Sequence, residues 1–225
     1  MKRFLRDSGL SLFFLVIFLA AIIGQAFAGL ANQNEELAMH GQPPMGFLDF
    51  VTSSDFLVDV AENWQSEFLQ FFLFILATIW LIQKGSPESK KPGDEGVGSD
   101  EEQYVGEYAL ADSPRWARDT GLRGWLYSNS LLIAMGTIFL LSWLAQSLAG
   151  VVVANEENAQ HGMPDETWAQ YVVSPEFWNR TLQNWQSEFL AVGSMVAFSV
   201  YLRQRGSSES KPVGAPHHKS SVSSE

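Results

Sequence analysis

The 225-residue chain contains no cysteine, which excludes disulfides, thiolate zinc sites, thiol nucleophiles and cysteine-ligated iron–sulfur clusters. Basic residues are also scarce: 14 Lys and Arg stand against 25 Asp and Glu, for a formal net charge of −11. Because phosphate binding needs a concentrated basic patch, this balance argues against nucleic acid as a partner. The chain also lacks a P-loop, a dinucleotide fingerprint, a nucleophile elbow and an H-E-x-x-H motif. We therefore predict no catalytic residue, no cofactor and no metal site.

Apolar residues gather in four segments. Residues 10–30 and 131–153 are long enough to cross a bilayer, because about 20 helical residues span about 30 Å of hydrocarbon. Residues 68–82 and 189–202 are shorter, and they need flanking interfacial residues or local thinning of the bilayer to span it. The sequence thus predicts four transmembrane helices.

An internal repeat relates the two halves of the chain. Residues 63–69 read N-W-Q-S-E-F-L, and residues 184–190, which follow 121 residues later, read the same. Without any gap, this offset also pairs residues 34–36 with 155–157 and the His-Gly at 40–41 with that at 161–162. So many identities in one register indicate a tandem duplication of a two-span unit.

Each copy is predicted to be an antiparallel helical hairpin. The first helix stops at Gly41 or Gly162, because a glycine followed by proline two residues later is a C-terminal signal. In the second copy, the second helix is predicted to start at Ser174, which is followed by a proline. The corresponding signal in the first copy, at Ser53, is weaker. The predicted fold is therefore all-α: a transmembrane four-helix bundle whose helices of about 30 residues overhang the outer surface.

Composition divides the chain into four parts. Residues 1–84 form the first two-span repeat, and residues 115–205 contain an interfacial segment and the second repeat. That interfacial segment combines tryptophans with Arg115, Arg118 and Arg123 just before the third span. The acidic linker 85–114 and the tail 206–225 are predicted to be disordered, because they have too little apolar surface to offset the entropy of ordering.

The N-terminus has two interpretations. Three basic residues precede an apolar run that ends in Ala26-Phe27-Ala28, a pattern that signal peptidase accepts. The run is longer than a usual signal core, however, and its repeat counterpart lies in the middle of the chain. We expect the segment to remain attached as a membrane span.

The distribution of basic residues predicts orientation. Of the 14, 13 lie before the first span, between the second and third, or after the fourth; Arg180 is the exception. Because cytoplasmic loops carry the excess of Lys and Arg, both termini are predicted to be cytoplasmic. Two copies that insert in the same sense make parallel repeats about an axis along the membrane normal.

Polar residues beside or within the spans are the candidate functional or packing residues. They are Glu67, Glu188, Asn63, Asn184, Gln25, Gln146, His40, His161, Glu36 and Glu157. A carboxylate this close to hydrocarbon is costly without a partner, so Glu67 and Glu188 either form a site at the outer mouth or, as we favour, pack equivalently against amides of the other repeat. The two in-span glutamines favour hydrogen bonding between helices.

The two histidines each follow a glutamate by four residues. His40 follows Glu36 and His161 follows Glu157, a spacing that suits an imidazole and a carboxylate around a metal ion. The simpler interpretation, which we favour, is an i, i+4 pair at a helix C-terminus, where the helix dipole stabilises His.

Three strings point to a family. They are N-E-E-x-A-x-H-G-x-P, N-W-Q-S-E-F-L and the closing Q-R-G-S-x-E-S-K-P of residues 204–212. With these strings the chain resembles, over nearly its whole length, an uncharacterised bacterial integral membrane family, domain of unknown function 6766. The resemblance implies a bacterial membrane protein and carries over no catalytic residue, substrate or cofactor.

Two functional classes follow from these features. The first is a non-enzymatic, multi-pass protein of the cytoplasmic (inner) membrane that is structural or binds partners: the lipid bilayer, and envelope proteins or a second copy. The alternative is a small transporter or channel whose polar path is lined by the paired Glu and Gln residues. We favour the first, because no ionisable residue lies near the midplane of a predicted span.

Overall fold

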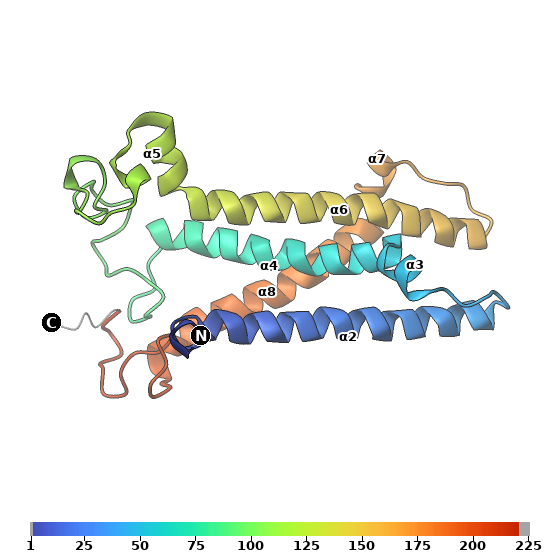
Figure 1. Ribbon diagram of the computed structural model, residues 1–225, viewed down its shortest axis with the longest axis horizontal. Helices are drawn as coiled ribbons and strands as arrows, with labels where there is room; N and C mark the ends of the chain where they lie inside the picture. The colour runs from blue at the N-terminus through green and yellow to red at the C-terminus, as the bar shows by residue number, and fades with distance from the viewer. Residues whose placement is uncertain (1, 221–225) are drawn as a thin grey trace. The chain divides into compact units, whose positions relative to one another are not determined.

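The computed structural model describes residues 2–220; Met1 and the last five residues of the predicted tail lie outside this range. Within it the chain is all-α, as predicted, with eight α-helices, two short 3₁₀ helices and no strand. The four long helices are α2 (Gly9–Met39), α4 (Ser54–Trp80), α6 (Ser130–Gln160) and α8 (Pro175–Tyr201), as Figure 1 shows. The short elements are α1 (Lys2–Asp7), α3 (Phe47–Val51), η1 (Gly106–Tyr108), η2 (Arg115–Arg118), α5 (Gly121–Ser128) and α7 (Trp168–Tyr171).

The helix bounds follow the 121-residue offset of the sequence. Helices α2 and α6 have 31 residues each and begin at residues 9 and 130. Helices α4 and α8 have 27 residues each and begin at residues 54 and 175. The short helices α3 and α7 begin at residues 47 and 168. Each of these three elements therefore has a counterpart 121 residues later.

Helices α2 and α6 end in the same way. The glycine after each helix adopts a positive φ, 68° at Gly41 and 67° at Gly162. The next N–H then reaches back to the helix, from Gln42 to the Leu37 carbonyl at 2.9 Å and from Met163 to the Asn158 carbonyl at 2.8 Å. This is the Schellman closure, and it confirms the predicted stop signals.

The N-caps predicted for α4 and α8 are also present. The Ser174 hydroxyl accepts a hydrogen bond from the Phe177 N–H at 3.2 Å, with Pro175 in the first helical position. Its counterpart Ser53 accepts from the Phe56 N–H at 3.3 Å. Each cap satisfies one N–H that the first turn of a helix leaves without a partner.

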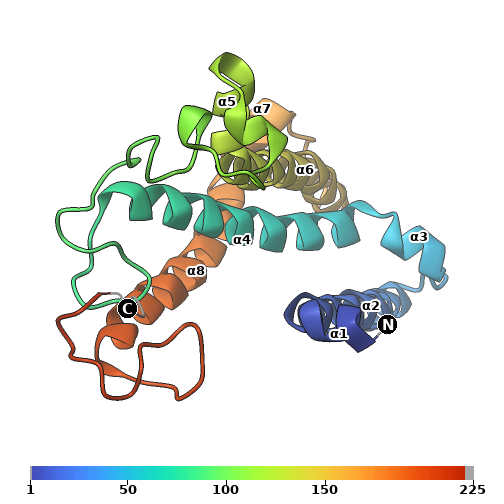
Figure 2. The same cartoon turned by 60° about the vertical axis from the view of Figure 1, so that its left-hand side comes forward.

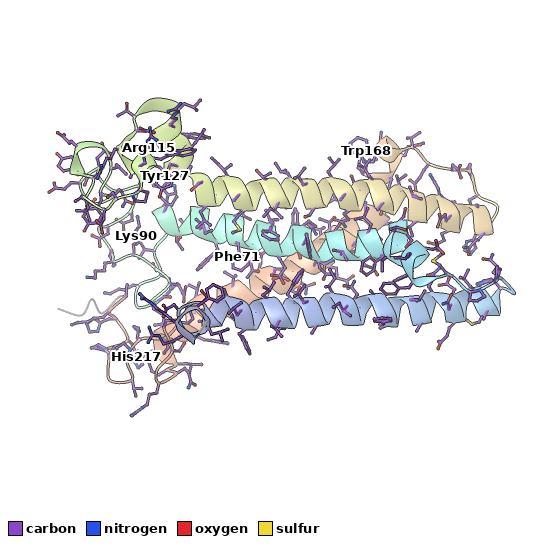
Figure 3. The ribbon with its side chains drawn as sticks, viewed as in Figure 1. Phe71, Lys90, Arg115, Tyr127, Trp168 and His217 are labelled. Carbon is purple, nitrogen blue, oxygen red and sulfur yellow. The ribbon has the colours of Figure 1, made fainter. Side chains whose placement is uncertain are left out.

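The chain divides into two compact units, Met1–Ala61 with Ala145–Val172 and Glu62–Leu144 with Val173–Glu225. In the first unit, short helices pack against glycines of long ones. A Cβ on Gly29 of α2 would lie 2.7 Å from Cζ of Phe50 in α3, and a Cβ on Gly150 of α6 would lie 2.8 Å from Cε1 of Tyr171 in α7. The absence of a side chain at each glycine therefore leaves the space that the buried ring of Phe50 or Tyr171 occupies. Trp168, labelled in Figure 3, adds a hydrogen bond from α7 to α6, from its Nε1 to Ser147 Oγ at 3.0 Å.

In the second unit, η2 and α5 form a block directly before α6, drawn in green in Figure 2. The rings of Trp116 and Tyr127 meet edge to face at 6.3 Å. The Arg118 guanidinium donates to the carbonyls of Leu110 and Ala111 at 2.7 and 2.9 Å. These contacts give the basic aromatic segment that the sequence identified a defined local fold.

The segments after α4 and α8 have matching hydrogen bonds. The Gln83 N–H donates to Ser89 Oγ at 2.8 Å, and the Gln204 N–H donates to Ser210 Oγ at 2.9 Å. The ammonium of Lys211, only 3% exposed, donates to three backbone carbonyls. Composition predicts disorder in both segments, and their described residues contain these hydrogen-bonded turns.

Candidate functional site

Two helices are long and apolar enough to cross a membrane. Among residues 2–220 these are α2 and α6, and only 6% of the most apolar stretch of α2 is buried, against 33% for α6. Phe13, Val16 and Phe27 of α2 are 59%, 65% and 59% exposed. Exposed apolar surface of this extent is unfavourable in water and is typical of a helix that contacts lipid or another apolar surface.

A charged contact joins the N-terminal halves of α4 and α8. Arg180 Nη1 lies 3.3 Å from Glu62 Oε2, and Arg180 Nε lies 3.6 Å from Glu176 Oε1. The amide of Asn184 donates to Glu62 Oε1 at 2.7 Å. Asn184 was a candidate from the sequence, whereas Glu62 was missed. The signal that could have found Glu62 is Arg180, the one basic residue in the segments that the sequence predicts to lie outside, because such a residue favours an acid nearby.

The repeated N-W-Q-S-E-F-L string forms a contact next to this ion pair. Trp185 Nε1 donates to Gln65 Oε1 at 2.8 Å, and Gln65 is fully buried. Because Glu62 contacts Arg180 and Gln65 contacts Trp185, the two helices run in the same direction across this contact. The second copy differs, since Gln186, the counterpart of Gln65, is exposed.

Aromatic rings of α6 and α8 surround the same place. The Trp143 ring stacks on Phe177 at 6.0 Å, meets Trp178 edge to face at 6.0 Å and lies 6.2 Å from Trp185. Thr181, on α8 between Phe177 and Trp185, is fully buried. Neither its hydroxyl nor the Trp143 indole nitrogen has a hydrogen-bond partner among the described residues.

The two repeated glutamates are not equivalent in the structure. Glu67 is exposed, whereas Glu188 is half-buried. Burial, together with the nearby charge of Glu67, raises the pKa of Glu188 above its ordinary value of 4.5. The sequence predicted equal packing roles for this pair, and their unequal burial follows from side-chain surroundings that the repeat string does not encode. Asn63, in the same string, is exposed.

The in-span glutamines also differ. Gln25 is half-buried, and Gln146 is fully buried. Neither the amide nitrogen nor the amide oxygen of Gln146 has a partner among the described residues, so the interhelical hydrogen bond expected there is not formed within them. An amide in this state is costly, because burial removes its bonds to water without replacing them.

The histidines bind the backbone and not the carboxylates. His40 Nδ1 lies 2.9 Å from the Glu36 carbonyl, and His161 Nδ1 lies 2.9 Å from the Glu157 carbonyl. Since a carbonyl only accepts, Nδ1 must carry the proton. All four residues are exposed. The part of the chain that the structure describes contains no group of three or more His, Cys, Asp or Glu that could hold a metal ion.

Two asparagines that the sequence marked only as repeat matches have clear roles. Asn34 is bonded twice to the backbone of Met45, and Asn155 is bonded twice to the backbone of Glu166. Residues 45 and 166 contribute only main-chain atoms, so their side chains give no sequence signal. Both bonded pairs hold the turn that follows a long helix.

The chain belongs to the family described as domain of unknown function (DUF6766), whose sequence model matches residues 1–222. This confirms the resemblance seen in the repeated strings. Neither the curated proteins nor the solved structures give a match.

Proposed function

We propose that this chain is a four-span protein of the bacterial cytoplasmic membrane, built from two parallel repeats with both termini inside. The exposed apolar surface of α2 supports membrane insertion. The 121-residue offset of helix bounds and the common direction of α4 and α8 at their contact support parallel repeats. The position of 13 of 14 basic residues supports the orientation.

Within that membrane we propose a non-enzymatic role, in which the outer ends of the hairpins bind an envelope protein or a second copy. The observation that carries this role is the pair of clasped turns at residues 34–45 and 155–166. Each stands beside exposed acids, at 35–36 and at 156–157. A turn held by backbone hydrogen bonds presents these charges in one defined place, which suits recognition of a basic partner surface.

Co-purification from native membranes tests this role. We expect proteins retained by the parent chain to be lost when the outer acids at 35, 36, 156 and 157 are changed to Gln. The matched control changes four exposed acids of the inner linker, Asp94, Asp100, Glu101 and Glu107, to their amides, and it should retain the same proteins. The proposal would be contradicted if the parent and the variant with four changed outer acids retained the same proteins. It would also be contradicted if the parent retained no protein beyond background.

A second candidate is a small transporter or channel, and the buried amide of Gln146, whose nitrogen and oxygen have no partner among the described residues, favours it. Polar side chains with unpaired atoms inside a membrane bundle are typical of a solute path. Flux into proteoliposomes distinguishes the two candidates. A solute flux in the parent that Gln146→Leu abolishes, and Gln186→Leu does not, would replace the partner-binding role with transport.

A further inference from the structure

Three hydrogen-bond donors at the contact of α4, α6 and α8 have no partner among the described residues. They are Nε2 of Gln65, Nε1 of Trp143 and Oγ1 of Thr181, and all three atoms are buried. Gln65 and Thr181 are 0% exposed. A buried donor that gives up water without a replacement is strongly unfavourable, so three of them in one contact need a physical explanation.

The three donors border one place. Phe177, Thr181 and Trp185 are spaced four residues apart on α8 and therefore lie on one face. The Trp143 ring contacts the first and the last of them, at 6.0 and 6.2 Å, and so lies across the face that carries Thr181. Gln65 is held beside Trp185 by the 2.8 Å bond to its Oε1, which leaves the amide nitrogen as the free end.

The repeat shows that packing does not require these donors. The residues 121 positions before Thr181 and Trp143 are Val60 and Ile22, which are apolar and half-buried. Gln186, the counterpart of Gln65, is exposed. An apolar residue is therefore compatible with the architecture at two of the three positions. The counterparts of the three donors therefore do not form a second set of buried donors.

The chemistry of the donors limits what could satisfy them. An indole N–H, an amide N–H₂ and a hydroxyl all offer hydrogens, so the ligand must present an acceptor. A cation is unsuitable, because the partially positive hydrogens of all three groups would repel it. An anion would lack compensation, because the nearby Arg180 already pairs with Glu62 and Glu176, and burying a charge without a partner is costly.

We infer that the α4–α6–α8 contact binds one small uncharged molecule through an acceptor oxygen, either water or a carbonyl-bearing solute. Its oxygen accepts hydrogen bonds from two of the three donor groups, and the Thr181 hydroxyl, which can also accept, can bond a hydrogen of the same molecule. The rings of Trp143, Phe177 and Trp185 enclose it. The site does not depend on the partner-binding role, because a scaffold and a transporter can both hold it.

The test uses the full chain in detergent and two variants, the nearly isosteric Thr181→Val and Trp143→Phe, which also reduces the size of the ring; each removes one donor. Controls are Thr78→Val, whose hydroxyl bonds its own helix at the Ile75 carbonyl, and Trp125→Phe, an exposed residue of α5. The probe is formamide, titrated while tryptophan emission and the thermal midpoint are followed. Loss of one neutral hydrogen bond should weaken formamide binding by about threefold to tenfold in both variants and in neither control.

The outcomes distinguish three cases: a site for a carbonyl-bearing solute, a site for water, and no site. Formamide binding that weakens in the two variants identifies a carbonyl-bearing solute. No formamide response, with both variants less stable and the double variant losing less than the sum of the single losses, identifies a water shared by both donors. The inference is overturned if formamide has no effect and Thr181→Val is as stable as the parent or more so. Additive losses without a formamide response also overturn it.

Discussion

The side-chain amide of Asn155 holds the backbone of Glu166 by two hydrogen bonds. The Glu166 N–H donates to Oδ1 at 2.8 Å, and Nδ2 donates to the Glu166 carbonyl at 3.0 Å. Asn34 and Met45 repeat the arrangement at 2.6 and 3.2 Å. A side-chain amide can bond the N–H and the carbonyl of one residue in this way because it carries an acceptor and donors in a fixed plane. These hydrogen bonds fix how the chain turns after α2 and after α6.

Removing a clasp should destabilise the fold. We expect Asn34→Ala and Asn155→Ala each to lower the free energy of unfolding by about 1–3 kcal/mol, because the N–H and the carbonyl of a half-buried residue both lose their partners. Chemical unfolding in detergent, followed by tryptophan fluorescence, measures the loss. The control is Asn129→Ala, since this side-chain amide makes a single, solvent-exposed bond to the Trp125 carbonyl at 2.8 Å, and its loss should be smaller. Clasp variants as stable as the parent would show that the turn is held by other contacts.

The glycine contacts predict opposite effects of one substitution at two positions. A methyl group on Gly150 would overlap the ring of Tyr171, whereas one on Gly24 meets no atom within 4 Å. Gly150→Ala should therefore lower the thermal midpoint. Gly24→Ala should raise it slightly, because alanine inside a helix is more favourable than glycine by ~0.5–1 kcal/mol of free energy. Differential scanning fluorimetry of the two variants is sufficient. A midpoint for Gly150→Ala at or above that of Gly24→Ala would be incompatible with the packing described.

The raised pKa of Glu188 predicts a pH dependence with a definite sign. The folded chain binds this proton more tightly than the unfolded chain, so the stabilisation is complete below pH 4.5 and is lost as pH rises through the folded pKa. Glu188→Gln should remove this loss and make the variant more stable than the parent above that range. Unfolding midpoints between pH 4 and pH 8 measure it. Glu67→Gln should act in the same direction by removing the neighbouring charge, and no difference between either variant and the parent across that range would contradict the assignment.

The sequence predicted the parts of this structure that depend on local signals. The stops at Gly41 and Gly162 and the cap at Ser174 were readable, because glycine with a positive φ and an N-cap serine act within a few residues. Contacts between distant elements were not readable. The burial of Thr181 and the unequal environments of Glu67 and Glu188 depend on which helices meet, and no spacing within one helix encodes that.

The labelling of single cysteines in intact cells tests the four-span topology most directly, because the chain has no cysteine of its own. The positions are Gln42, Ser99, Gln160 and Ser208, all exposed. With four spans and cytoplasmic termini, an impermeant maleimide should label positions 42 and 160, and should label 99 and 208 only after permeabilisation. If α2 and α6 alone crossed the membrane, positions 42 and 99 would react and 160 and 208 would not. That second pattern would contradict the account.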